Sequence, residues 1–295
     1  MTIPAYNIKK LTLQDPPEKK GKESLMKGVS TTTSLFRQPE AGLLPLQEAV
    51  LLLVEAEFPY LELSGSHLST TPSDKLTVPK EIQVWAVHGQ TDFSISSLDP
   101  SVREEAVEKE KNLMKKAGHF APCHYIIHYV NRSHNPAVGE AFLRSIEELL
   151  KTNEGIGYTL ALETVPDKPS NERYVTSLEI AEFVRSFHSP SLSICIDLNH
   201  SNIAETIEET AHNCAGLISS IHVSDNHGEM EEHLQPGEGI INFASAFQAL
   251  YHAGYKGPIN FEYHLSQRAT PTVKHLKEMK EWAERMIRTL PAIPK

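Results

Sequence analysis

Short apolar runs alternate with amphipathic stretches along most of this chain. The apolar runs are rich in Val, Ile and Leu, which is typical of strands that are buried on both faces. They predict eight strands, at residues 28–34, 60–63, 82–87, 124–129, 158–163, 191–197, 217–223 and 258–262.

Most of the stretches between these runs carry apolar residues at i, i+3, i+4 and i+7, the spacing of an amphipathic helix. The exception is 64–81, which contains Pro, Ser and Thr without a helical period. We therefore expect the second helix to be short or missing. The predicted helices lie at 46–58, 102–117, 138–150, 177–187, 203–212, 243–253 and 273–290.

The alternation of strands and helices predicts parallel βαβ units, and eight such units favour a (β/α)8 TIM barrel of the α/β class. An open, doubly wound sheet is the alternative architecture. Such a sheet normally carries a glycine-rich turn after its first strand. The segment 31–39 contains no glycine, which favours the barrel.

The first residues of the chain differ in composition from the rest. Residues 1–27 carry six lysines against three acidic residues, and prolines at 4, 16 and 17, with no sustained apolar period. We expect an N-terminal extension that is partly disordered or packed on the barrel. No other linker divides the chain, so residues 28–295 are predicted to form one barrel domain.

The bulk composition is that of an ordinary globular protein. The chain has 295 residues, of which 40% are hydrophobic, and it has neither an apolar run of membrane-spanning length nor an apolar signal region. Its three cysteines form no CxxC pair, which disfavours a disulfide framework. We therefore expect a cytoplasmic protein. The net charge of −10 disfavours nucleic acid as a ligand, because an acidic surface repels phosphates.

Metal-ligating residue types stand at the ends of six successive predicted strands. In a barrel, the carboxyl ends of the strands meet in one shared mouth. Carboxylates clustered without a cation would raise one another's pKa values, whereas carboxylates and imidazoles together suit Mn²⁺, Mg²⁺, Co²⁺ or Zn²⁺. The sequence therefore predicts a divalent metal ion at this mouth. The six residues are His88, His128, Glu163, Asp197, His222 and Glu262.

Several short motifs follow these strand ends in order. They are SSLDPSVREEAVEKEKNLMKKAG (96–118), ALETVPD (161–167), CIDLNH (195–200), IHVSDN (221–226), HLQPGEG (233–239) and INFEYH (259–264). With this set the chain resembles the xylose-isomerase-like TIM barrels. These include sugar and sugar-phosphate isomerases and epimerases, such as tagatose/psicose 3-epimerases, and endonuclease IV is a relative. The resemblance implies one metal ion bound by Glu163, Asp197, His222 and Glu262.

The same resemblance implies a catalytic mechanism. The ion would bind a ketose carbonyl oxygen and a neighbouring hydroxyl oxygen and acidify the C–H bond between them. Glu163 and Glu262 would lie on either face of this carbon, one removing a proton and the other returning it through a metal-stabilised enediolate. The predicted function is a metal-dependent isomerase or epimerase of a sugar or sugar phosphate.

Five further residues are predicted either to contact the substrate or to bind a second metal ion. They are His88, His128, His200, Glu231 and His233. Endonuclease IV binds a further zinc ion through an Asp-x-His motif, where this chain has Glu231-Glu232-His233. The longer side chain of glutamate disfavours a trinuclear zinc site.

Two other functions stay open. One is an endonuclease IV-like, zinc-dependent hydrolase acting on abasic DNA, and the other is a barrel that binds a sugar or metal without catalysis. The acidic barrel and Glu231 favour the sugar enzyme over the hydrolase, and the intact pair of glutamates disfavours loss of catalysis. The sequence is compatible with a homo-oligomer and does not identify the sugar.

Overall fold

The computed structural model of the chain describes residues 26–38, 42–90, 93–130, 135–165, 175–265 and 271–290. The predicted extension, 1–27, therefore lies outside the described residues except for Met26 and Lys27. Met26 is buried in the hydrophobic core. The ammonium of Lys27 lies 4.9 Å from the ring centroid of Trp85.

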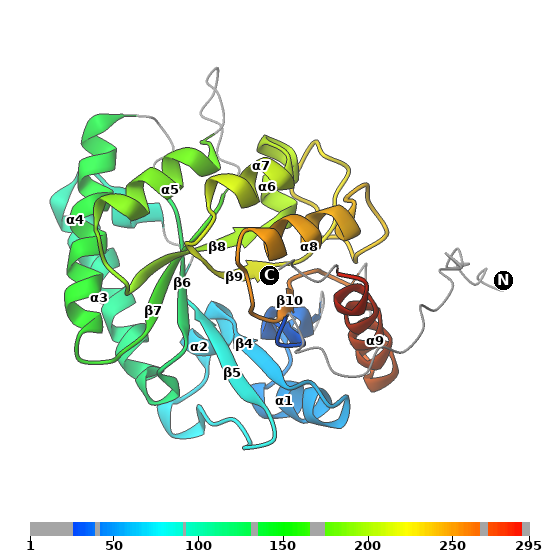
Figure 1. Cartoon of the computed structure of the whole chain (residues 1–295). Helices are drawn as coiled ribbons and strands as arrows, with labels where there is room; N and C mark the ends of the chain where they lie inside the picture. Colours follow the sequence, from blue (N-terminus) through cyan, green and yellow to red (C-terminus); the bar gives the residue numbers. More distant parts are fainter. Residues whose placement is uncertain are drawn as a thin grey trace, which may run out of the picture.

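Parallel strands run around the centre of the molecule (Figure 1). Six of them form one sheet in chain order, and β1 pairs with β10 in a second parallel sheet. Parallel bridges join the two sheets on both sides, between Thr32 and Glu62 and between Val223 and Phe261. The strands are β1 (Val29–Thr31), β4 (Tyr60–Leu63), β5 (Gln83–His88), β6 (His124–His128), β7 (Thr159–Glu163), β8 (Leu192–Asp197), β9 (Ile218–His222) and β10 (Ile259–Phe261).

The predicted α/β class is confirmed, and the alternative of an open doubly wound sheet is wrong. The bridges on both sides of the β1–β10 pair leave the six-stranded sheet without a free edge. Each of the eight predicted strands is present, with bounds that differ from the prediction by a few residues.

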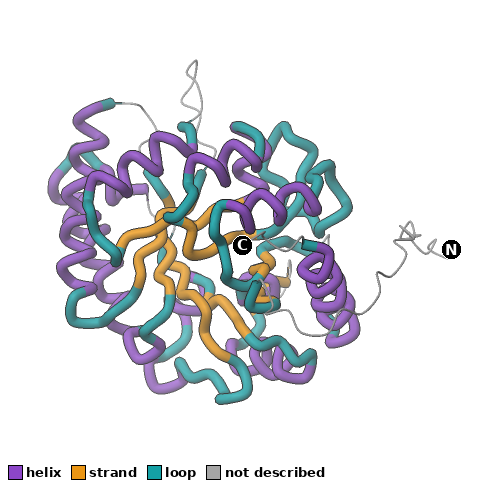
Figure 2. Tube along the Cα trace, in the orientation of Figure 1, coloured by secondary structure: helices purple, strands orange, loops and turns teal. Residues whose placement is uncertain are grey.

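The helices surround the strands, as Figure 2 shows in purple and orange. Most begin at a side chain that accepts a backbone N–H, such as Asp99, Asn135, Thr176 or Thr272, which satisfies a donor that the first turn leaves unpaired. The long helices are α1 (Leu46–Glu55), α3 (Pro100–Lys116), α4 (Pro136–Asn153), α5 (Ser177–Ser186), α8 (Phe243–His252) and α9 (Val273–Thr289).

Three segments differ from the prediction or refine it. The strand predicted at 28–34 ends at Thr31, because the Thr32 side chain caps a 3₁₀ helix at Thr33–Phe36. The second helix is short, as expected: α2 spans Gly65–Thr70 and a 3₁₀ turn follows at Ser73–Lys75.

The helix predicted at 203–212 is two helices, α6 (Leu198–Ala204) and α7 (Ile207–Asn213). Glu205 has extended backbone angles, and a reciprocal capping box between Thr206 and Glu209 starts the second helix. The structure also contains a short antiparallel pair that was not predicted, β2 (Arg37–Gln38) with β3 (Gly42–Leu43). Shorter 3₁₀ turns lie at Phe93–Ser96 and Gly118–Phe120.

Apolar side chains pack on both sides of the strands. Those facing outward join the helices in the main hydrophobic core. A separate cluster of Trp85, Ala86, Ile126, Ala161 and Cys195 fills the inside of the barrel. Because this cluster closes the interior, polar groups at the carboxyl ends of the strands can gather above it.

Among the helices described, none combines the length and the apolar character needed to cross a membrane.

Candidate metal centre at the barrel mouth

The six predicted strand-end residues converge on Glu163, the last residue of β7. This carboxylate is buried, and its two oxygens lie within 3.4 Å of four imidazoles. The four imidazoles belong to His88, His128, His200 and His222. The arrangement follows from parallel pairing, which aligns the end of β7 with the ends of β6 and β8.

Four of the residues form a compact group of donor atoms. One ligand atom each from Glu163, Asp197, His222 and Glu262 lies within 4.8 Å of the others. Asp197 Oδ2 and His222 Nδ1 are buried without a hydrogen-bond partner. His222 Nδ1 approaches Glu262 Oε2 at 2.7 Å, but not with hydrogen-bond geometry.

Unpartnered polar atoms are costly in a protein interior. A divalent cation among these four donors would satisfy all of them, and mixed oxygen and nitrogen ligands suit such an ion. The residues present therefore fit the metal ion that the sequence predicts.

The imidazoles of the site offset the charge of its carboxylates. Burial is the largest single effect on Glu262 and would raise its pKa, but the contact with His222 and the charges of His222 and His88 together outweigh burial and lower the pKa to about 2. Burial likewise opposes protonation of His88, yet the hydrogen bond and charge of Glu163 raise the pKa of this imidazole to about 9. Asp197 differs, because burial dominates and raises its pKa.

A second group lies beside the first and contains the other predicted residues, His200, Glu231 and His233. The Nδ1 of His200 donates to the Thr164 carbonyl at 2.8 Å, and that of His233 donates to the Glu262 carbonyl at 3.0 Å. Both rings therefore turn Nε2 toward Glu231 Oε1, at 3.5 Å and 2.7 Å respectively. The Nε2 of His200 is buried without a hydrogen-bond partner.

The loop that carries Glu231 and His233 is held by a buried carboxylate, Asp225. Its two oxygens accept four backbone N–H groups, from Asn226, Gly237, Gly239 and Ile241, at 2.9–3.0 Å. A Cβ at Gly239 would lie 2.4 Å from Asp225 Oδ1, so the close approach requires glycine. These contacts give the SDN and PGEG motifs a structural role.

The backbone of His233 also departs from the ordinary, with a φ of 49°. Such a left-handed conformation is unfavourable for a residue other than glycine and often accompanies a functional position. The local contacts hold this conformation, since His264 N donates to the His233 carbonyl at 2.8 Å.

Glu62 is a residue of the site that the sequence reasoning missed. It is fully buried on β4, and its carboxylate accepts a hydrogen bond from His222 Nε2 at 3.0 Å. Asn260 donates to the same carboxylate oxygen at 2.8 Å. The available signal was a glutamate inside the short buried run YLEL (60–63).

The two groups open into a hollow of about 530 Å³ at the mouth. This volume suits a small molecule. Hydroxyl, amide and charged side chains line it, which suits a ligand with many hydroxyl groups. The lining includes His88, His128, Glu163, His200, Glu231, His233 and Glu262, together with Thr32, Ser34, Ser64, Ser66, Ser69, Gln90 and Lys109.

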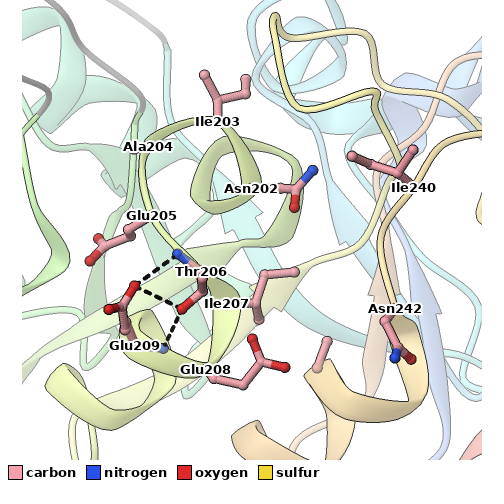
Figure 3. Close-up of a pocket in the computed structure, with 11 residues that line it drawn as sticks. Asn202, Ile203, Ala204, Glu205, Thr206, Ile207, Glu208, Glu209, Ile240 and Asn242 are labelled. Atoms are coloured by element: carbon pink, nitrogen blue, oxygen red, sulfur yellow. Dashed lines mark hydrogen bonds between the residues drawn. The ribbon is translucent and has the colours of Figure 1, made fainter.

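A second hollow, of about 520 Å³, lies between α6, α7 and the start of α8 (Figure 3). None of the residues predicted for the site lines it. Thr206 and Glu209, whose hydrogen bonds are drawn in Figure 3, cap α7. These two side chains are therefore accounted for by the fold.

Fold and site together define a parallel α/β barrel with a carboxylate–histidine centre at the carboxyl ends of its strands. The sequence model of the family described as "Xylose isomerase-like TIM barrel" matches residues 72–286. The chain belongs to this family, and the resemblance inferred from its motifs is confirmed.

Individual relatives agree with this assignment. A ketose 3-epimerase of Arthrobacter globiformis is 24% identical over 190 residues, which cover 62% of this chain and 63% of that protein. An uncharacterized protein of Methanocaldococcus jannaschii is 27% identical over 203 residues, covering 66% of this chain and 68% of that protein. The chain is thus related to sugar epimerases, and it spans less than two thirds of the Arthrobacter enzyme.

A solved structure of a D-tagatose 3-epimerase-like protein has the same fold. It superposes with a TM-score of 0.71 at 21% sequence identity, covering 88% of this chain and 98% of that one.

Proposed function

We propose that this protein is a metal-dependent isomerase or epimerase of a sugar or sugar phosphate. The observation that carries the proposal is the placement of two carboxylates, Glu163 and Glu262, in one donor group at the mouth of the hollow. Epimerisation needs two such groups, because the proton must leave one face of a carbon and return on the other. The relation to ketose 3-epimerases supports the same class of substrate.

Glu163, Asp197, His222 and Glu262 would hold the ion, and their mixed oxygen and nitrogen donors suit Mn²⁺, Mg²⁺, Co²⁺ or Zn²⁺. When bound, a divalent ion supplies Lewis-acid polarisation of a ketose carbonyl. One glutamate then accepts the proton from the adjacent carbon and the other returns a proton. Return to the opposite face of the same carbon gives epimerisation, and return to the neighbouring carbon gives isomerisation.

The histidines around this pair would orient the substrate. His88 and His128 line the hollow, as do His200 and His233. Ring N–H groups can donate to sugar oxygens.

The test of catalysis is the Glu262→Gln variant. Gln keeps the size of the side chain but cannot carry a proton, so kcat for a ketose should fall by about 10²–10⁴-fold. Epimer formation, and exchange of the C–H proton with D₂O, are followed by NMR on a panel of ketoses and ketose phosphates. Glu281→Gln, an exposed glutamate on α9, is the matched control and should keep full activity. Activity that survives Glu262→Gln contradicts the acid–base assignment.

A second cation at His200, Glu231 and His233 is a separate proposal. The fixed orientation of both rings and the unpartnered Nε2 of His200 favour it over a role in substrate contact alone. Elemental analysis of the purified protein and of Glu231→Ala tests it: the variant should lose one equivalent of metal. Equal metal content in the two proteins contradicts it.

The same analysis separates the two enzyme classes. One ion per chain, especially manganese, or two if the second cation is present, supports the isomerase when abasic DNA is not cleaved. About three zinc ions per chain, with cleavage of abasic DNA, would overturn it in favour of the endonuclease IV-like hydrolase.

A further inference from the structure

Glu62 places a carboxylate in the barrel wall, outside the four proposed metal ligands. Its neighbours Leu61 and Leu63 pack in the main hydrophobic core. Because side chains alternate along a strand, Glu62 faces the barrel interior. The side chain is completely buried, and a carboxylate in this position is costly unless strong donors surround it.

The donors that Glu62 receives connect it to the metal centre. His222 Nε2 and Asn260 Nδ2 both donate to Glu62 Oε2, at 3.0 Å and 2.8 Å. The other ring nitrogen of His222, Nδ1, faces Glu163 Oε1 at 3.3 Å and Glu262 Oε2 at 2.7 Å. The imidazole of His222 is therefore held between a carboxylate outside the donor group and carboxylates within it.

This geometry decides which nitrogen of His222 is free to bind a cation. A neutral imidazole carries one proton, and the nitrogen without it is the ligand atom. The carboxylate of Glu62 holds that proton on Nε2, which leaves the lone pair of Nδ1 directed at Asp197, Glu163 and Glu262. A carboxylate partner also makes the imidazole a stronger ligand.

We propose that Glu62 is a positioning residue of the metal site, which fixes the ring and the tautomer of His222 for ligation through Nδ1. This inference rests on the metal site of the proposed function. Asn260 supports Glu62 in turn, since its amide donates to the same carboxylate oxygen as His222 does.

The experiment is a calorimetric titration of the metal-free protein with Mn²⁺, without any sugar. Loss of an outer partner of a ligating histidine weakens metal binding by about 10–100-fold. We expect this range for Glu62→Leu, which fills the space without an acceptor, and a smaller loss for Glu62→Gln, which keeps an acceptor oxygen. Melting of the metal-free variants shows whether the fold is retained.

Glu110→Gln is the matched control. Glu110 is also buried, and its carboxylate accepts a hydrogen bond from Tyr125 at 2.6 Å. Replacing it tests whether any buried carboxylate of the barrel has the same effect. Its Mn²⁺ affinity should stay within about twofold of wild type, against the about 10–100-fold loss expected at Glu62.

Mn²⁺ affinity that is unchanged in a folded Glu62→Leu protein overturns the proposal, and so does an equal loss in Glu110→Gln. A measurement on the wild type covers the case in which the Glu62 variants do not fold. In protein labelled with ¹⁵N-histidine and loaded with Zn²⁺, the His222 signals, assigned from His222→Gln, should show a protonated Nε2 and a metal-bound Nδ1. Ligation through Nε2 would contradict the proposal.

The outcome is separable from that of the proposed function. A protein that binds Mn²⁺ with the expected dependence on Glu62 but converts no ketose contradicts the function and supports the role of Glu62. A protein that converts ketoses but has the same Mn²⁺ affinity with and without Glu62 supports the function and contradicts the role of Glu62. A wild type that takes up no Mn²⁺ or Zn²⁺ contradicts both proposals, because both depend on the metal site.

Discussion

His124, the first residue of β6, carries a titratable group away from the metal centre. Its ring lies 4.6 Å from that of Trp85, and its Nδ1 is buried without a hydrogen-bond partner. Burial, with a smaller effect of the Lys27 charge, lowers the pKa of His124 to about 4. The folded protein therefore holds this imidazole neutral at a pH where an unfolded chain would protonate it.

This shift predicts a loss of stability in mild acid. Between the unfolded pKa of about 6.5 and the folded pKa of about 4, the unfolded chain binds a proton that the folded protein does not, so the free energy of unfolding falls as pH falls. His124 costs no stability above about pH 6.5, and the loss that it causes reaches about 3 kcal/mol by pH 4.

Urea unfolding at several pH values checks this prediction. A His124→Gln variant should lose less stability than wild type between pH 6.5 and 4, whereas His252→Gln, at an exposed position on α8, should follow wild type. Parallel pH profiles for wild type and His124→Gln would refute the prediction.

At the scale of elements, the loop after β9 depends on one side chain. The carboxylate of Asp225 accepts four backbone N–H groups of this loop, in addition to the antiparallel bridge between Asp225 and Leu234. The same loop carries Glu231 and His233 into the mouth. The conformation of this loop therefore determines where Glu231 and His233 lie relative to His200.

Asp225→Asn should loosen the loop and leave the barrel folded. The amide offers one acceptor oxygen in place of two, and each buried N–H left unpaired costs about 1–3 kcal/mol. Hydrogen exchange should become faster in residues 226–241 and stay unchanged in β6 to β8. Asp99→Asn, an exposed helix cap on α3, is the control. Unchanged exchange in the loop would show that Asp225 does not hold it.

At the scale of the whole molecule, the proposed metal ion joins segments that the chain keeps apart. Its four ligands come from the ends of β7, β8 and β9 and from the residue after β10. A ligand that binds only the folded state stabilises it by mass action. The ion should therefore hold this side of the barrel together.

Metal removal should lower the melting temperature of the protein. At a free metal concentration 100 times Kd, binding adds about 2.7 kcal/mol to the free energy of unfolding. Differential scanning fluorimetry with EDTA, and then with added Mn²⁺, measures the loss and its recovery. Asp197→Asn should show a much smaller response. A wild-type melting temperature that is the same with EDTA and with Mn²⁺ contradicts a metal site among these residues.

The amino-acid sequence alone determined the strands, most of the helices and the residues that could bind metal. Strand and helix periods are properties of neighbouring residues, so they can be read locally. The gathering of Glu163, Asp197 and His222 was also predictable, because each ends a strand and parallel strands end at the same side of a barrel.

Only the tertiary structure decided which of these side chains form each of the two groups of ligands, and which hydrogen bonds orient them. Glu62 and His222 are 160 positions apart, and their contact depends on closure of the barrel and on the direction of both side chains. Asp225 is a more local case, because its donors at Gly237, Gly239 and Ile241 lie 12, 14 and 16 positions away and meet it only once the loop has folded. Local patterns determine which side chains reach the mouth, but hydrogen bonds between distant segments determine the orientation of each donor atom there.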